Sequence, residues 1–127
     1  MQVTLASQDD FLLATAAGRV SIKEVLRVFK SVIDTATKRG FDKILMDFMA
    51  VNGELSAMDL YDIGKAMAEY CRSKSIHPKV GLVGKPPTVS GFAAEVASNR
   101  GLISRTFSER QPALNWLLAF SLKAPRS

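Results

Sequence analysis

The sequence predicts an α/β fold with a mostly parallel sheet, in which an N-terminal hairpin is followed by a βαβαβα succession. Short apolar runs alternate with segments whose apolar residues recur at helical spacing, which is typical of βαβ units. Glycines follow two of the helical segments, where a helix commonly ends. The chain has 127 residues, of which 47% are hydrophobic. This length supports one sizeable core, so we expect one domain over residues 1–127.

The first 40 residues predict a hairpin and a long helix. The polar stretch SQDD separates the apolar runs VTLA and FLLATAAG, and it suits a tight connection between two strands. The following sequence, SIKEVLRVFKSVIDTATKRG, has apolar residues at helical spacing. Ser21 and Glu24 have the spacing of a capping box at its start. Gly40, which follows two basic residues, is placed to end this helix.

The remaining chain alternates strands and helices. KILMDFMAV, residues 43–51, is apolar at both odd and even positions, which predicts a strand buried on both faces and central in its sheet. Ser108 is placed to cap the last helix, with Pro112 in its first turn. The other expected strands cover residues 79–85 and 103–108, and the expected helices cover residues 56–74, 90–101 and 109–122.

Composition and charge exclude several classes of protein. Cys71 is the only cysteine, which excludes an internal disulfide and a thiolate metal cluster within one chain. The chain shows neither a signal-peptide pattern nor an apolar stretch long enough to cross a bilayer. The net charge of +5 is scattered, without a dense basic run. We therefore expect a cytoplasmic protein with no nucleic-acid partner and no stable membrane insertion.

The residues that carry most enzyme chemistry are scarce. His77 is the only histidine, and Cys71 falls on an apolar helical stripe, as a buried inert thiol would. These two residues assemble no nucleophile with a base, so we expect no catalytic residues, no metal and no organic cofactor. Asp47 is an ionisable residue inside an apolar strand. It either accepts hydrogen bonds from the following loop or supports a carboxylate-only reaction.

Two other segments are candidate sites. GKPPTVSG, residues 84–91, follows a strand and opens a helix, so Lys85, Ser90 and Gly91 form a candidate anion or ligand site, although the segment matches neither a P-loop nor GxGxxG. Ser56 stands at the expected start of the helix after the central strand, with Asp59 three residues later. Ser56 is either a helix cap or a regulatory phosphorylation site, because a helix N-terminus also favours a phosphate group.

The order of elements resembles the SpoIIAA-like branch of the STAS-like superfamily. The resemblance extends over the whole chain and rests on FLLATAAGRVS, KRGFDKILMDF, LSAMDLYDIGKAMA, KVGLVG and NRGLISRTFSERQPALNWL. It implies a (βα) superhelix with the helices mainly on one side of the sheet. In the anti-sigma-factor antagonists of this superfamily, a serine at the position of Ser56 is phosphorylated and controls binding to a protein. Those proteins carry an Asp-Ser-Ser-Gly type sequence where this chain has Glu-Leu-Ser-Ala.

The resemblance favours a non-enzymatic regulatory domain that binds a protein partner. The alternative is a binder of a small apolar or anionic ligand, because the fold also resembles the lipid-carrying CRAL-TRIO domains, although this chain is short for enclosing a long acyl chain. Helices on one side leave the other face of the sheet to be covered. We therefore expect a two-fold homodimer through the hairpin or the open sheet face, where Leu12 and Leu45 are candidate contact residues. The alternative is that the C-terminal segment around Trp116 and Phe120 folds back over part of this face.

Overall fold

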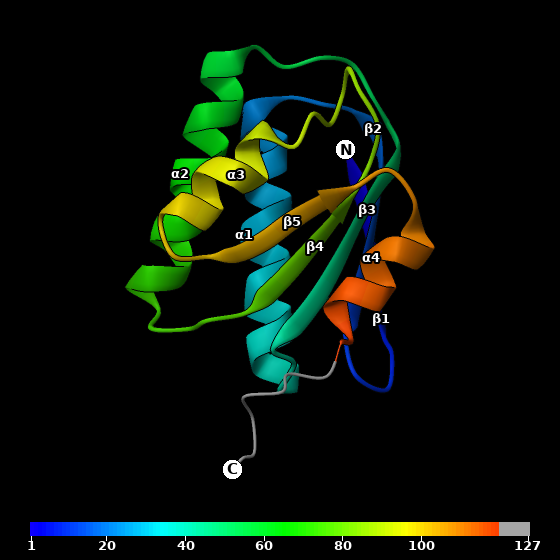
Figure 1. Cartoon of the computed structure of the whole chain (residues 1–127), viewed down its shortest axis with the longest axis vertical. Coiled ribbons are helices and arrows are strands. Elements are labelled where there is room, and N and C mark those ends of the chain that lie inside the picture. Colours follow the sequence, from blue (N-terminus) through cyan, green and yellow to red (C-terminus); the bar gives the residue numbers. More distant parts are fainter. Residues whose placement is uncertain (120–127) are drawn as a thin grey trace.

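A hairpin, a long helix and three βα units make up the part of the chain that the computed structural model describes, residues 1–119 (Figure 1). The elements in chain order are β1 (Gln2–Ser7), β2 (Leu12–Arg19), α1 (Ile22–Arg39), β3 (Lys43–Asn52), α2 (Ala57–Ser73), β4 (Lys79–Val83), α3 (Phe92–Asn99), β5 (Ile103–Phe107) and α4 (Arg110–Leu117). The expected order of strands and helices is confirmed.

The five strands form one sheet in the order β1-β2-β3-β4-β5. β1 pairs with β2 in antiparallel orientation, and the three other pairs are parallel. β3 is therefore the central strand, as its apolar pattern predicted. The mostly parallel α/β sheet with an N-terminal hairpin is confirmed.

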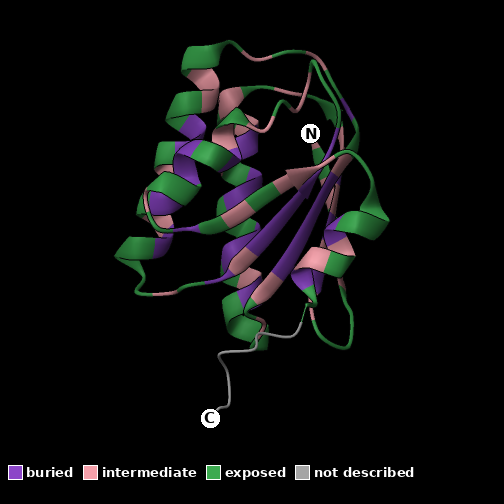
Figure 2. Ribbon diagram, viewed as in Figure 1, coloured by how far each residue is buried: buried purple, intermediate pink, exposed green. Residues whose placement is uncertain are grey.

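The helices lie unequally on the two faces of the sheet. α1, α2 and α3 cover one face and build the main core with β2, β3 and β4, around side chains such as Phe29, Ile44 and Met67. α4 covers part of the other face, where Leu45, Val83 and Leu117 form a second, smaller core. Figure 2 shows β3 and β4 buried along much of their length between these layers. The expectation that the helices lie mainly on one side is confirmed.

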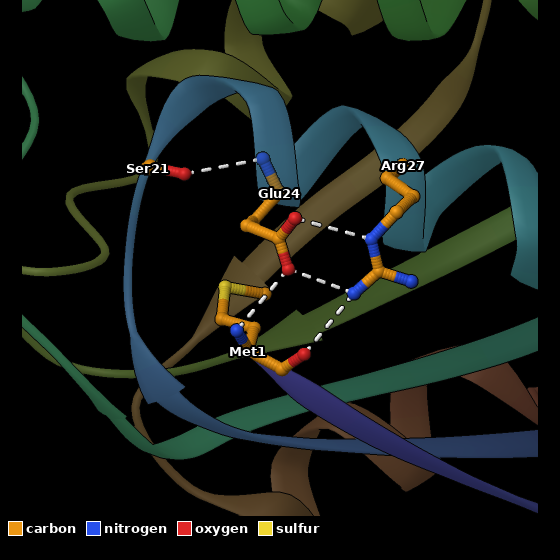
Figure 3. A network of polar contacts seen from close by, with 4 residues as sticks. All are labelled: Met1, Ser21, Glu24 and Arg27. Carbon is orange, nitrogen blue, oxygen red and sulfur yellow. Dashed lines mark hydrogen bonds and ion pairs between the residues drawn. The ribbon is translucent and has the colours of Figure 1, made fainter.

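The ends of α1 follow from its sequence. The Ser21 hydroxyl accepts a hydrogen bond from the Glu24 amide at 3.2 Å, and Gly40 adopts a left-handed conformation (φ 81°) just past the last turn. The Glu24 side chain does not complete a capping box. It instead accepts hydrogen bonds from the Met1 amino group at 3.2 Å and from Arg27 Nη2 at 2.8 Å (Figure 3). This carboxylate therefore fixes the start of β1 to the first turns of α1.

The structure corrects two expectations about the sheet and its last helix. Ser108 does not cap α4, because the helix begins one residue later than expected and its N-cap is Glu109, which makes no side-chain cap hydrogen bond. Residues 120–122 of the expected helix, with Phe120, lie outside the described residues. Leu12 and Leu45 do not line an open face either, because both have 0% exposure within one chain. Leu12 faces the main core and Leu45 lies under α4.

The contact between α2 and α3 leaves no room for a side chain at Gly64. A Cβ atom there would overlap the Ala93 carbonyl oxygen and lie 2.8 Å from Val96 Cβ. Gly64→Ala gains about 1 kcal/mol in helix propensity, but overpacking against a backbone atom costs more. We expect Gly64→Ala to lower the free energy of unfolding by about 2 kcal/mol in urea denaturation. Lys65→Ala, at the next and exposed position of α2, should change it little, and equal stability of both variants would contradict this packing.

The Glu24 network predicts an acid-sensitive contribution to stability. Hydrogen bonds from Arg27 and from the Met1 amino group hold the pKa of Glu24 at about 2, below its ordinary value of 4.5. Since the folded pKa is the lower one, the contribution is complete above about pH 4.5 and is lost as the pH falls towards 2. Glu24→Gln should flatten the fall in unfolding midpoint across this range. The exposed Glu69→Gln should keep the wild-type slope, and a wild-type slope in Glu24→Gln would contradict the network.

Candidate functional site

An apolar cavity lies at the carboxyl ends of the parallel strands, between the sheet and the three helices of the main core. Its volume is about 50 Å³. The carboxyl ends of the strands in an open α/β sheet are the common position of ligand sites. The lining side chains from the strands and helices are almost all apolar and include Phe29, Met46, Val51, Leu60, Ile63, Met67 and Leu82.

Two loops meet beside this cavity. One is loop 84–91, which connects β4 to α3, and the other connects β3 to α2. The Thr88 hydroxyl donates a hydrogen bond of 2.6 Å to the Gly53 carbonyl oxygen and so joins the two loops. Val89, Ser90 and Gly91 line the cavity from the first loop, and Leu55 lines it from the second. The cavity is therefore bordered by both segments that the sequence singled out.

Thr106 is one of the residues that line the cavity, and it carries an unusual polar atom. It lies on β5, and its Oγ1 atom is buried without a hydrogen-bond partner, the only such side-chain atom within residues 1–119. Buried hydroxyl groups normally have a partner, because leaving one unsatisfied costs about 1–3 kcal/mol. Gly91 leaves the space beside Thr106 open, since a Cβ atom on Gly91 would stand 4.0 Å from this oxygen.

Ser56 caps α2 as its spacing predicted. Its hydroxyl accepts a hydrogen bond from the Asp59 amide at 3.0 Å, and the Asp59 carboxylate accepts one from the Ser56 amide at 3.3 Å, which completes a capping box. The residue is exposed, one position after the cavity residue Leu55. The Ser56 hydroxyl is therefore structurally engaged and also reachable from outside. Phosphorylation of Ser56 stays a prediction.

The three residues of the candidate anion site are only partly brought together. Ser90 and Gly91 lie at the start of α3, where Gly91 is the left-handed N-cap (φ 90°) and Ser90 Oγ accepts a long hydrogen bond of 3.4 Å from the Phe92 amide. Lys85 lies at the opposite end of loop 84–91, and its exposed side chain forms no ion pair or hydrogen bond within the described chain. Anion binding by these residues stays a prediction.

Asp47 forms hydrogen bonds that hold the structure together. Its side chain is 10% exposed and accepts a hydrogen bond of 2.9 Å from the Met49 amide. Arg110 of α4 donates to the other carboxylate oxygen from Nε at 3.2 Å and from Nη2. The carboxylate therefore bonds the backbone of β3 two residues ahead, and not the following loop as one interpretation of Asp47 expected, and it also holds the start of α4 against β3.

The remaining candidates for chemistry are separate from this region. Cys71 is buried in the main core, and burial raises the pKa of its thiol to about 11, so it stays protonated at neutral pH. His77 is exposed in the loop before β4. Across residues 1–119, no three His, Cys, Asp or Glu side chains gather as a metal site would require. In the same range no helix is both long and apolar enough to cross a bilayer.

Sequence patterns did not reveal three residues that shape this region: Thr88, Thr106 and Arg110. Thr106 occupies a position on β5 that faces α3, next but one to Ser104, whose hydroxyl donates to the Ala94 carbonyl oxygen at 2.8 Å. A hydroxyl residue on the inward side of a strand was therefore the available signal. The pairing of Arg110 with Asp47 joins residues 63 positions apart, and no local pattern encodes it.

Comparison with known proteins assigns the fold. No family model and no curated protein matches the chain. The structure of an anti-sigma factor antagonist from Mycobacterium paratuberculosis is similar with a TM-score of 0.61 and 13% identity, over 91% of this chain and 92% of that one. An uncharacterised protein with a SpoIIAA-like fold from Shewanella loihica is similar with a TM-score of 0.51 and 20% identity, over the same shares. This chain therefore has a SpoIIAA-like fold.

Proposed function

We propose that this chain is a non-enzymatic regulatory domain that binds a protein partner through the surface at the start of α2. The observation that carries the proposal is the exposed capping serine, Ser56, beside large exposed side chains. Met58 is 66% exposed and Tyr61 is 37% exposed, both within the first turns of the same helix. Exposed apolar side chains grouped on one surface favour a contact with another protein.

The comparison with solved structures also supports a role in binding a protein partner. One similar structure is that of an anti-sigma factor antagonist. In this chain a phosphate on Ser56 would meet the positive end of the α2 dipole and add negative charge to the exposed surface. Modification of Ser56 is the regulatory step of the proposal, and the cytoplasm is the compartment we expect for it.

The polar groups that could carry a reaction have other roles in the proposal. The Asp47 carboxylate is engaged with Arg110 and the Met49 amide, so both of its oxygens have structural partners and it holds α4 against β3. The Cys71 thiol is buried and protonated. A binding role therefore accounts for the described residues with fewer assumptions than an enzyme.

A homodimer remains part of the proposal, with a smaller surface available to it. α4 already covers Leu45 and Val83 on the second face of the sheet. The uncovered part of that face belongs to the hairpin, where Thr4 and Thr15 are opposite each other in the pairing of β1 with β2. These threonines make the uncovered part of the face less apolar than the sequence pattern suggested. We therefore assign self-association to the edge of the sheet that the hairpin forms, and not to the whole second face.

Substitutions of Ser56 separate its cap role from a regulatory one. Ser56→Ala removes the hydroxyl acceptor and should lower the free energy of unfolding by about 1 kcal/mol. Ser56→Asp should leave it almost unchanged, because aspartate caps a helix as well as serine does. Under the regulatory proposal, Ser56→Asp also changes partner binding in a capture assay. Binding that is identical in wild type, Ser56→Ala and Ser56→Asp would leave Ser56 as a cap alone.

Two exposed methionines allow a matched test of the binding surface. Met58→Glu places a charge on the proposed surface, and Met49→Glu places the same charge at the end of β3, where Met49 is 48% exposed. We expect Met58→Glu to lose a partner that wild type and Met49→Glu both retain from an extract of the native host. Equal recovery of the partner by all three proteins would contradict the assignment of the binding surface. Light scattering of the same samples measures their mass and so distinguishes a monomer from the proposed homodimer.

A further inference from the structure

We propose that the open edge of β5 binds an extended segment of a partner protein, which adds to the sheet as a further strand and carries an acidic side chain opposite Arg105. This inference goes beyond the proposed function, which concerns the start of α2 and assigns self-association to the hairpin at the other edge of the sheet. It rests on three observations: the unpaired main chain of β5, the groove beside it and the charge of Arg105.

The main chain of β5 presents hydrogen-bonding groups at the edge of the sheet. In the described chain, β5 pairs with β4 and with no other strand. The Phe107 carbonyl oxygen accepts a hydrogen bond from the Gly84 amide, so it points towards β4. Main-chain groups of successive residues in a strand point to opposite sides. Those of Ser104 and Thr106 therefore point away from β4, and no group of residues 1–119 bonds to them. These four groups are the template that an added strand needs.

A groove of about 300 Å³ lies beside this edge, between α3 and β5. Small side chains of α3, including Ala94 and Ser98, border it on one side, and residues 104–106 border it on the other. The Arg105 side chain lies on the opposite face of β5, where its guanidinium carbon is 5.5 Å from the centre of the Phe107 ring. Arg105 therefore borders the groove with its main chain. The groove leaves room for alternate side chains of an extended peptide.

The opposite face of β5 specifies the other side chains of the partner segment. Ile103, Arg105 and Phe107 alternate on this face. Ile103 is 52% exposed, and the exposed Arg105 forms no ion pair with the described residues. Directly opposite side chains of paired strands stabilise the pairing when they are both apolar or oppositely charged. An antiparallel segment centred on Arg105 is therefore complementary when it carries apolar, acidic and apolar residues at alternate positions.

The charge of Arg105 also selects a different protein over a second copy of this chain. Antiparallel pairing of two β5 strands through the outward groups of Ser104 and Thr106 would place Arg105 opposite its own counterpart. Like charges directly opposite each other destabilise a pair of strands. Natural edge strands use charged side chains in this way to prevent self-pairing. A segment with a carboxylate at the same position is attracted instead.

The probe for this edge is the acetylated and amidated peptide Thr-Val-Thr-Glu-Thr-Val-Thr. NMR titration of the labelled wild-type protein should give saturable shifts of the Ser104 and Thr106 amides. The α-hydrogens of the peptide glutamate and of Arg105 should show a cross-strand contact, because the Cα atoms of such an antiparallel pair are about 4.5 Å apart. Absence of saturable shifts at both amides up to millimolar peptide would overturn the proposal. Shifts of the same amides that follow protein concentration without peptide would also overturn it, since they would show self-pairing.

Two N-methylated peptides test the main-chain pairing without a change in the protein. In the bound peptide, the amides of the threonines beside glutamate point towards β5, and the glutamate amide points away. A methyl group on either of these threonine amides should abolish binding, because it removes a donor and enters the space between strands that lie about 4.8 Å apart. Methylation of the glutamate amide should preserve binding. Equal effects at the two kinds of position would overturn strand addition.

Charge reversal at Arg105 tests the side-chain preference. Wild type should bind the glutamate peptide about fivefold more tightly than the same peptide with lysine in place of glutamate. Arg105→Glu should invert this preference. Lys23→Glu makes the same change of charge at an exposed position of α1 and should keep it. The same preference in wild type and Arg105→Glu would overturn the assigned pairing. None of these measurements depends on partner capture, so this edge and the proposed function are tested separately.

Discussion

Burial of β3 on both faces is the constraint on which the rest of the structure depends. Ile44 and Met46 point into the main core, and Leu45 between them points into the second core; all three are at most 1% exposed. A strand with this pattern needs a layer on each side. α1, α2 and α3 provide one layer, and the short helix α4 provides the other over the centre of the sheet.

The same constraint sets the position of the polar contacts. Asp47 follows the buried run on β3 and points towards the α4 face, where Arg110 satisfies its carboxylate. The parallel pairing of β3, β4 and β5 brings their carboxyl ends to one edge. Loop 84–91 and the start of α2 meet there, which places the Ser56 cap and the Thr106 hydroxyl in one region although 50 residues separate them.

The sequence predicted the features that local patterns encode. Apolar periodicity identified the elements, and the apolar residues at both parities placed β3 at the centre of the sheet. The caps at Ser21, Gly40 and Ser56 follow from short spacings. The predicted cap at Ser108 was wrong, because Glu109 occupies the N-cap of α4. Local patterns do not encode contacts across the fold. The coverage of Leu45 by α4 was therefore only the alternative to a dimer, and the open apolar face expected for a dimer proved to be partly internal.

The candidate site was predictable only at its edges, since Ser56, Ser90 and Gly91 have helix-start signatures but the cavity between them depends on packing.

Native-state hydrogen exchange tests the central claim, that α4 and the three-helix layer stabilise β3 together. Amides of Leu45 and Val83 should exchange only through global unfolding, and the hydrogen-bonded Leu117 amide of α4 should exchange with a free energy close to theirs. Rapid exchange in α4 while Leu45 stays fully protected would contradict the account, because it would show that β3 does not need its second layer.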